Sequence, residues 1–202
     1  MSLVLVAGNK NYILFMGEGR VTNQEGKEVE SNYRKIIKLK ENCIIGFAGD
    51  RNCCEAIIKP LTDGSINVNN LSFYEISEVV QSRANKIIEN INLGVWRKAN
   101  YYFALGCKEY GNLKLNAYFT DDGLGGVKCI SQYNYTLNDL APKLITLSSG
   151  VYDHYAYCQK LYSRNPEPDI NNMYKILKNT IIDGSEHDNT INTNVYSEKI
   201  LI

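Results

Sequence analysis

The sequence of 202 residues lacks a long hydrophobic run and an excess of either charge. No segment approaches the roughly 18 apolar residues that a membrane-spanning helix needs, and no basic region with an apolar segment and a cleavage site opens the chain. We therefore expect a cytoplasmic protein with no membrane partner. Lys plus Arg and Asp plus Glu both total 22, which leaves no positive excess to neutralise a phosphate backbone. We accordingly expect no nucleic-acid partner.

Metal and redox motifs are also missing. The two histidines, His154 and His187, lie far apart in the sequence without ligand-like neighbours, and no CxxC or paired Cys/His spacing occurs. We expect neither a metal nor a cofactor. Most of the six cysteines lie in apolar runs, which favours buried free thiols; they are Cys43, Cys53, Cys54, Cys107, Cys129 and Cys158.

What is present is the composition of an ordinary globular protein, with 44% hydrophobic and 22% charged residues. The length suits one large domain, and no internal repeat, low-complexity tract or proline-rich linker marks a boundary. We therefore expect a single domain over residues 1–202.

Short apolar runs between turn signals predict strands, and longer runs of helical periodicity predict helices. The expected strands are Leu3–Ala7, Tyr12–Met16, Lys35–Leu39, Cys43–Phe47, Tyr101–Leu105, Leu113–Phe119, Gly126–Ile130, Lys143–Leu147 and Thr190–Tyr196. The expected helices are Arg51–Ile58, a long one from Ser72 to Gly94, Val151–Tyr162 and Asp169–Ile182.

Local signals fix several of these limits. Ser72 and Glu75 have the spacing of a capping box, and Pro60 is expected to stop the helix before it. We also expect a strand break at Gly17–Gly19, a loop over Asn23–Asn32 and a tight turn at Thr120–Gly123. Strand clusters that alternate with helix pairs favour an α+β fold, in which two antiparallel sheets pack together and carry helices on their outer faces.

Several short blocks occur in an order that resembles the proteasome β-type subunits, with most similarity to the bacterial proteasome-like peptidases. The blocks are Ser2-Leu3-Val4-Leu5-Val6, Gly17-Glu18-Gly19-Arg20-Val21-Thr22, Tyr33-Arg34-Lys35-Ile36, Ile45-Gly46-Phe47-Ala48-Gly49-Asp50 and, later, Ser148-Ser149-Gly150. The resemblance implies the four-layer αββα sandwich of N-terminal-nucleophile hydrolases, which agrees with the element order above.

The resemblance also implies a mechanism and a set of site residues. In such enzymes the first residue after processing attacks with its hydroxyl or thiol, and its own α-amino group, of pKa about 7.7–8.0, accepts the proton. Carried over by position, the residues are Ser2 as nucleophile, where the family has Thr; Glu18 at an acidic position that is Asp in the family; Lys35 at its lysine; Gly49 at the glycine whose N–H stabilises the oxyanion; Ser149 near the terminal amine; and Asp188 as a second acid.

Two functions stay open at this point. The chain is either an amidohydrolase that cleaves peptide or other amide bonds through Ser2, or a catalytically silent proteasome-like subunit that serves assembly or binding. The resemblance further implies a homo-oligomeric ring or stack, and leaves open whether an ATP-driven unfoldase takes part. Tyr152, Tyr155, Tyr157 and Tyr162 are expected to pack against the sheet or a neighbouring subunit.

Overall fold

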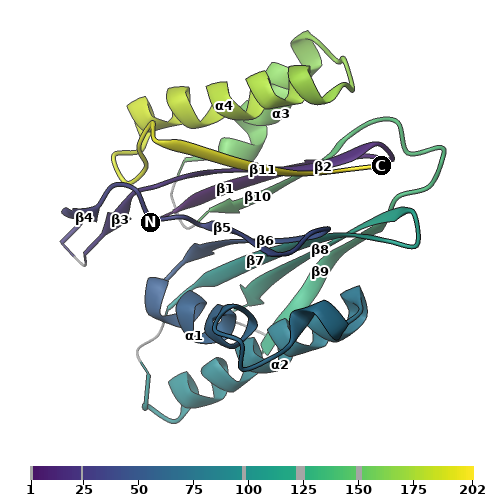
Figure 1. Ribbon diagram of the computed structural model, residues 1–202. Coiled ribbons are helices and arrows are strands. Elements are labelled where there is room, and N and C mark those ends of the chain that lie inside the picture. The colour runs from purple at the N-terminus through teal and green to yellow at the C-terminus, as the bar shows by residue number, and fades with distance from the viewer. Residues whose placement is uncertain (1, 24, 97–98, 122–125, 149–151) are drawn as a thin grey trace.

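Two antiparallel sheets lie face to face, and helices cover both of their outer faces (Figure 1). The computed structural model describes residues 2–23, 25–96, 99–121, 126–148 and 152–202. The four-layer αββα arrangement expected from the element order is confirmed. The end of the expected turn at Thr120–Gly123 lies outside the described residues.

The first sheet has the strand order β10-β1-β2-β11. Its strands are β10 (Lys143–Ser148), β1 (Leu3–Gly8), β2 (Tyr12–Glu18) and β11 (Val195–Leu201). The expected hairpin forms because the Asn9 side chain accepts from the N–H groups of Asn11 and Tyr12 at the turn. Every residue of β1 and β2 is buried, since this sheet is covered by the second sheet on one face and by helices on the other.

The second sheet has the order β5-β6-β7-β8-β9. Its strands are β5 (Ile36–Lys40), β6 (Cys43–Gly49), β7 (Tyr101–Glu109), β8 (Asn112–Asp121) and β9 (Gly126–Asn134). Two short strands, β3 (Val21–Thr22) and β4 (Glu28–Glu30), pair with each other apart from both sheets. The loop that we expected over Asn23–Asn32 therefore contains one strand of a small hairpin.

Helices α1 (Arg51–Thr62) and α2 (Phe73–Asn92) cover the second sheet, and α3 (His154–Arg164) and α4 (Ile170–His187) cover the first. A single 3-10 turn, η1 (Val68–Asn70), precedes α2. The predicted capping box is confirmed, because Ser72 accepts from the N–H of Glu75 and the Glu75 carboxylate accepts from the N–H of Ser72.

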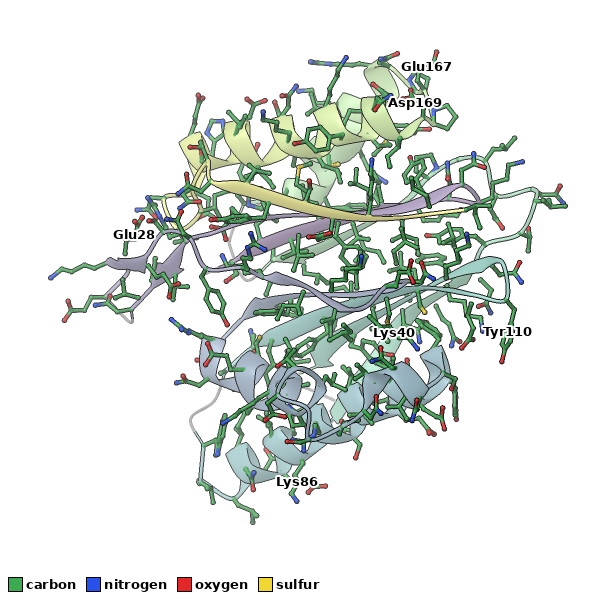
Figure 2. The ribbon with its side chains drawn as sticks, in the orientation of Figure 1. Glu28, Lys40, Lys86, Tyr110, Glu167 and Asp169 are labelled. Carbon is green, nitrogen blue, oxygen red and sulfur yellow. The ribbon has the colours of Figure 1, made fainter. Side chains whose placement is uncertain are left out.

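Three hydrophobic cores hold the four layers together. The central one lies between the sheets and includes Val4, Phe15, Ile44 and Leu115. The other two lie between each sheet and its helices. Figure 2 shows side chains filling the spaces between the layers, whereas labelled residues such as Lys86 lie on the outside.

Several expected limits are wrong; for example, α4 runs five residues past Ile182 and β7 runs four residues past Leu105. Helix α1 continues past Pro60 to Thr62, because Leu61 is buried in the core. Pro60 has no N–H to donate to the Ala56 carbonyl, and that carbonyl lies 3.4 Å from Arg83 Nη1 instead. Strand β2 runs to Glu18 instead of breaking at Gly17, since it pairs on both sides.

The last strand begins at Val195, five residues later than Thr190. Polar side chains occupy the preceding segment, where Asp188 accepts from the N–H of Thr190 and Asn192 accepts from the N–H of Asn194. These local hydrogen bonds compete with sheet pairing.

Cys43, Cys53, Cys54, Cys107 and Cys158 are buried free thiols, as predicted. Cys129 lies outside the residues whose side chains are described. In the part of the chain that the structure describes, no helix is both long enough and apolar enough to cross a membrane.

Candidate active site

Four of the predicted site residues lie at the same end of the sandwich. Ser2 precedes β1, Glu18 ends β2, Lys35 precedes β5 and Gly49 ends β6. Because β1 pairs antiparallel with β2, and β5 with β6, the start of one strand lies beside the end of its partner. Pairing therefore brings Ser2 near Glu18 in the first sheet and Lys35 near Gly49 in the second, and the face-to-face packing of the two sheets brings these four residues together.

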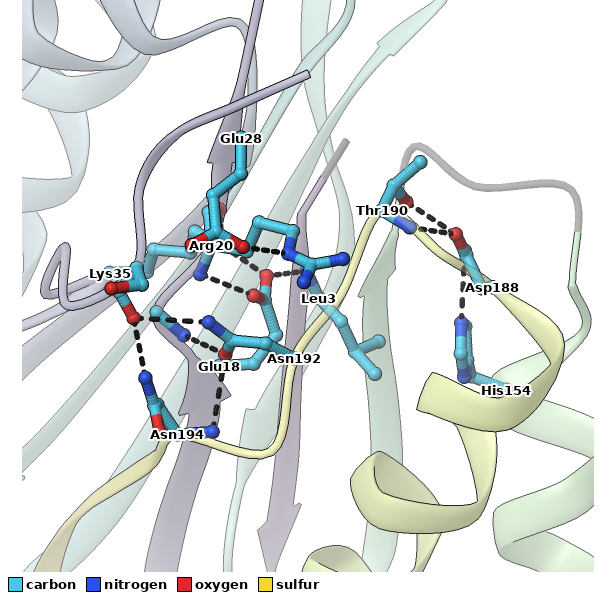
Figure 3. A network of polar contacts seen from close by, with 12 residues as sticks. Leu3, Glu18, Arg20, Glu28, Lys35, His154, Asp188, Thr190, Asn192 and Asn194 are labelled. Carbon is cyan, nitrogen blue, oxygen red and sulfur yellow. Dashed lines mark hydrogen bonds and ion pairs between the residues drawn. The ribbon is translucent and has the colours of Figure 1, made fainter. Parts of the chain in front are cut away.

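Glu18 and Lys35 form the centre of this end. Glu18 Oε1 and Lys35 Nζ form an ion pair, and the exposed fractions of the two side chains are 0% and 2%. Further hydrogen bonds reach both side chains: the N–H groups of Leu3 and Arg20 donate to the Glu18 carboxylate at 3.1 and 2.6 Å, and Lys35 Nζ donates to the Arg20 carbonyl at 2.7 Å. Figure 3 shows these contacts as one network.

Burial governs the electrostatics of Lys35. Desolvation lowers the pKa of its ammonium group, because the charged form loses its water, and the carboxylate of Glu18 offsets part of this effect. The result is a lysine that gives up a proton more readily than one in water, held in place by a fixed carboxylate.

Ser2 and Lys35 both line a cleft of about 850 Å³. Gly49 and Ala48 of β6 and Cys54 of α1 contribute to its wall. Burial raises the pKa of the Cys54 thiol well above its usual range, and its Sγ lies 3.6 Å from the Ala48 carbonyl. Cys54 is therefore a neutral part of the wall, and the hydroxyl of Ser2 is the better nucleophile candidate here.

Gly49 fits its position because only glycine can take the backbone conformation found there. Its φ is +109°, and a Cβ at this residue would lie 2.2 Å from the carbonyl oxygen of Asn100. The strand end and the start of α1 can therefore approach β7 closely at the cleft.

The rim of the cleft carries a charged cluster that sequence reasoning missed. The guanidinium of Arg51 lies 4.5 Å above the ring of Tyr33 and forms ion pairs with Glu30 of β4 and Glu55 of α1. The Tyr33 hydroxyl donates to Glu55 at 2.9 Å. These contacts fix the position of the β3–β4 hairpin relative to α1, although each residue in the sequence looks like an ordinary surface residue.

Of the other two predicted site residues, only Asp188 is among the described residues. Ser149 lies outside the described residues. Asp188 is not among the residues that line the cleft; its carboxylate accepts from the N–H of Thr190 at 2.9 Å and lies 3.6 Å from His154 Nε2. Burial raises the pKa of Asp188, but the hydrogen bonds from Thr190 and the contact with His154 outweigh it and lower the pKa overall. A catalytic role for either residue stays a prediction.

Two further polar residues, Arg20 and Asn192, were missed by sequence reasoning. Arg20 forms an ion pair with Glu28 at 2.6 Å and also donates through Nη1 to the Asn189 carbonyl. Asn192 Oδ1 accepts from the N–H of Gly19, next to Glu18. The only sequence signal for this arrangement is the density of asparagines over residues 189–194, a residue type that often binds backbone groups.

A scan of protein-family models and a search of curated proteins by sequence both find no match. Solved structures do match. HslV from Trypanosoma brucei superposes with a TM-score of 0.61 at 14% identity, over 99% of each chain.

Two structures of Anbu, an ancestral beta-subunit, match as well. The protein from Yersinia bercovieri has a TM-score of 0.72 at 12% identity over 98% of this chain and 81% of its own. A Gly-1 mutant from Hyphomicrobium sp. strain MC1 has a TM-score of 0.66 at 11% identity over 98% and 80%. The chain thus has the fold of the proteasome β-like N-terminal-nucleophile hydrolases; identities this low establish the fold alone.

Proposed function

We propose that this chain is an N-terminal-nucleophile amidohydrolase that cleaves peptide or other amide bonds with Ser2. The observation that carries the proposal is the shared cleft: Ser2, Lys35 and Gly49 line it together, and buried Glu18 holds Lys35. The likeness of the fold to HslV and Anbu supports the same assignment. The substrate that fits is an extended chain with an accessible amide carbonyl, since the cleft is open and lined by both apolar and polar side chains.

The mechanism begins with the hydroxyl of Ser2. Its oxygen attacks the amide carbon while the α-amino group of the same residue accepts the hydroxyl proton, which requires that Met1 has been removed. The N–H of Gly49 stabilises the negative oxygen of the tetrahedral intermediate. The amine leaves with the proton from the α-amino group, and water then hydrolyses the ester on Ser2, again with the α-amino group as base.

Lys35 assists by its charge. An ammonium group close to Ser2 lowers the pKa of the α-amino group and of the hydroxyl, and Glu18 keeps the lysine oriented. Because burial lowers the pKa of Lys35 itself, its effect declines once the lysine loses its proton at alkaline pH. Ser149 and Asp188 are proposed as polar groups that support the terminal amine.

We further propose that the protein acts in the cytoplasm as a single domain and assembles into a closed homo-oligomer. Closed symmetry is the usual outcome when copies of one soluble chain associate. Light scattering in solution tests the assembly directly, and the mass of a single chain would exclude it.

Mass spectrometry of protein made from the native gene tests the activity. We expect Met1 to be absent and Ser2 to form an adduct with a hydroxyl-directed electrophile such as a fluorophosphonate. Ser2→Ala abolishes the adduct, while Ser163→Ala, which changes an exposed serine on α3, leaves it intact. If Met1 is retained and Ser2 does not react, the chain is instead a silent proteasome-like subunit, and Ser2→Ala then leaves assembly unchanged.

A further inference from the structure

A short segment near the end of the chain crosses the two segments that carry Glu18 and Lys35. Residues 189–194 lie between α4 and β11, and Figure 3 shows the hydrogen bonds that Asn192 and Asn194 form with the backbone of these segments. This segment is separated from Glu18 by more than 170 residues of sequence. Its contacts with the site are therefore a product of the fold and have no local cause.

Asn192, in this segment, contacts both the segment that carries Glu18 and the segment that carries Lys35. Its Oδ1 accepts from the N–H of Gly19 at 3.2 Å, and its Nδ2 donates to the Ser31 carbonyl at 3.0 Å. Gly19 directly follows Glu18, and Ser31 lies four residues before Lys35. One amide side chain thus joins the backbone next to the carboxylate to the backbone that leads into the lysine.

Close packing at Gly19 restricts how far the segments that carry Glu18 and Lys35 can move relative to each other. A Cβ on Gly19 would lie 2.6 Å from the Ser31 carbonyl oxygen, so the two segments are already in close contact. The Gly19 carbonyl accepts from the N–H of Tyr33 at 2.9 Å. Asn192 completes this arrangement from a third segment, because it satisfies both the Gly19 N–H and the Ser31 carbonyl.

Arg20 extends the same link. Its N–H and carbonyl hold Glu18 and Lys35, and its guanidinium reaches the Asn189 carbonyl. The peptide groups that set the geometry of the ion pair are therefore fixed by residues 189–192 at two points.

We propose that Asn192 is a positioning residue for the Glu18–Lys35 pair, and through it for Ser2. Asn192 is not among the residues that line the cleft, and it acts by holding the two backbone segments in register. The inference rests on the proposed function where Ser2 is concerned, and on geometry alone where Lys35 is concerned.

The test compares Asn192→Ala with Asn194→Ala. Asn194 is a matched control: its Nδ2 donates to Ser31 and Asn32, on the Lys35 side only, and its side chain has no recorded contact with Gly19 among the described residues. Two rates are measured for each folded variant across pH: acetylation of Lys35 by acetic anhydride, located by mass spectrometry, and labelling of Ser2 by a fluorophosphonate.

We expect Asn192→Ala to raise the acetylation rate of Lys35 about tenfold, because loosened packing admits the reagent to a side chain that is only 2% exposed in the wild type. We expect Ser2 labelling to fall by a similar factor, because a displacement of roughly 1 Å can cost up to a hundredfold in rate. Asn194→Ala stays within about twofold of the wild type for both rates. Equal rates in Asn192→Ala and the wild type would overturn the proposal. Should Asn192→Ala not fold, Asn192→Leu, which has a side chain of similar size and removes both the acceptor for Gly19 and the donor for Ser31, provides the same comparison.

The two readouts separate this inference from the proposed function. If Ser2 of the wild type does not react but Lys35 acetylation still responds to Asn192→Ala, the proposed activity fails and the positioning role stands. If Ser2 reacts and neither rate responds, the activity stands and the positioning role fails.

Discussion

Glu18 and Lys35 face each other across the end of the sandwich as an ion pair from which water is almost completely excluded. A buried pair of this kind costs desolvation energy that its own attraction only partly returns. The hydrogen bonds from Leu3 and Arg20 to the carboxylate supply additional compensation. The ion pair therefore contributes little net free energy to folding, which is consistent with a role in the proposed chemistry.

The first prediction concerns the loss of one partner. Glu18→Gln leaves the Lys35 ammonium buried without an opposite charge, and we expect the free energy of unfolding to fall by about 3 kcal/mol. Lys35→Met added to this variant restores most of the stability, because the remaining pair is neutral, but it does not restore labelling of Ser2. Urea unfolding measures the first effect, and mass spectrometry the second.

An exposed ion pair provides the control for this prediction. Glu30→Gln removes a partner of Arg51 at the rim, where the two side chains are 40% and 41% exposed. We expect a change below about 1 kcal/mol, since solvent screens such pairs. A similar loss in Glu18→Gln and Glu30→Gln would contradict the special status of the buried pair.

The second prediction concerns acid. Burial lowers the pKa of His154 below its usual 6.5, and the nearby Asp188 only partly offsets this. As the pH falls through 6.5, the unfolded chain binds the proton before the folded one does, so stability falls. We expect the wild type to unfold at a lower urea concentration at about pH 5.5 than at about pH 7.5.

Two histidine variants decide whether His154 is the cause. His154→Gln should weaken this pH dependence, whereas His187→Gln, which changes an exposed histidine, should keep it. The assignment fails if the dependence disappears with His187 and persists without His154.

The third prediction concerns Gly49. Gly49→Ala forces a Cβ against the Asn100 carbonyl in a left-handed conformation, and we expect a loss of about 3 kcal/mol or more together with the loss of Ser2 labelling. Gly64→Ala is the matched control, because Gly64 also has a positive φ but has open space around it. It should cost only about 1–2 kcal/mol. Thermal and urea unfolding distinguish the two.

The fourth prediction concerns the thiols. Burial raises the pKa of Cys53 to about 12 and that of Cys158 to about 11, and alkylation requires the thiolate. Iodoacetamide at about pH 8 should therefore leave both unmodified in the folded protein and modify both in urea. Rapid modification of either one in the folded protein would show that its surroundings open readily.

Local patterns predicted most of the fold. The hairpin of β1 and β2 and the start of α2 follow from signals within a few residues, namely a turn with Asn9 and the Ser72 capping box. The expected helix end at Pro60 is wrong because buried Leu61 outweighs the lost hydrogen bond. Tertiary packing decides such cases, and a single sequence does not reveal it.

The residues of the candidate site likewise fall into two groups, those that the sequence predicted and those that it did not. Ser2, Glu18, Lys35 and Gly49 were predicted, because they stand at the ends of apolar runs that the resemblance aligned, and the structure brings them together. Arg20 and Asn192 were missed, since their importance depends on contacts between segments that are far apart in the sequence.

The strand order of the first sheet has a consequence for how the protein is made. The apolar hairpin of β1 and β2 is synthesised long before its two neighbours in the sheet, β10 and β11. In a growing chain the free edge of β1 therefore waits for residues 143–148 and that of β2 for residues 195–201, and such unpaired hydrophobic strand edges are prone to aggregation. Asn192 belongs to the segment that leads into β11, so its contacts with Gly19 and Ser31 form only after that segment has been made.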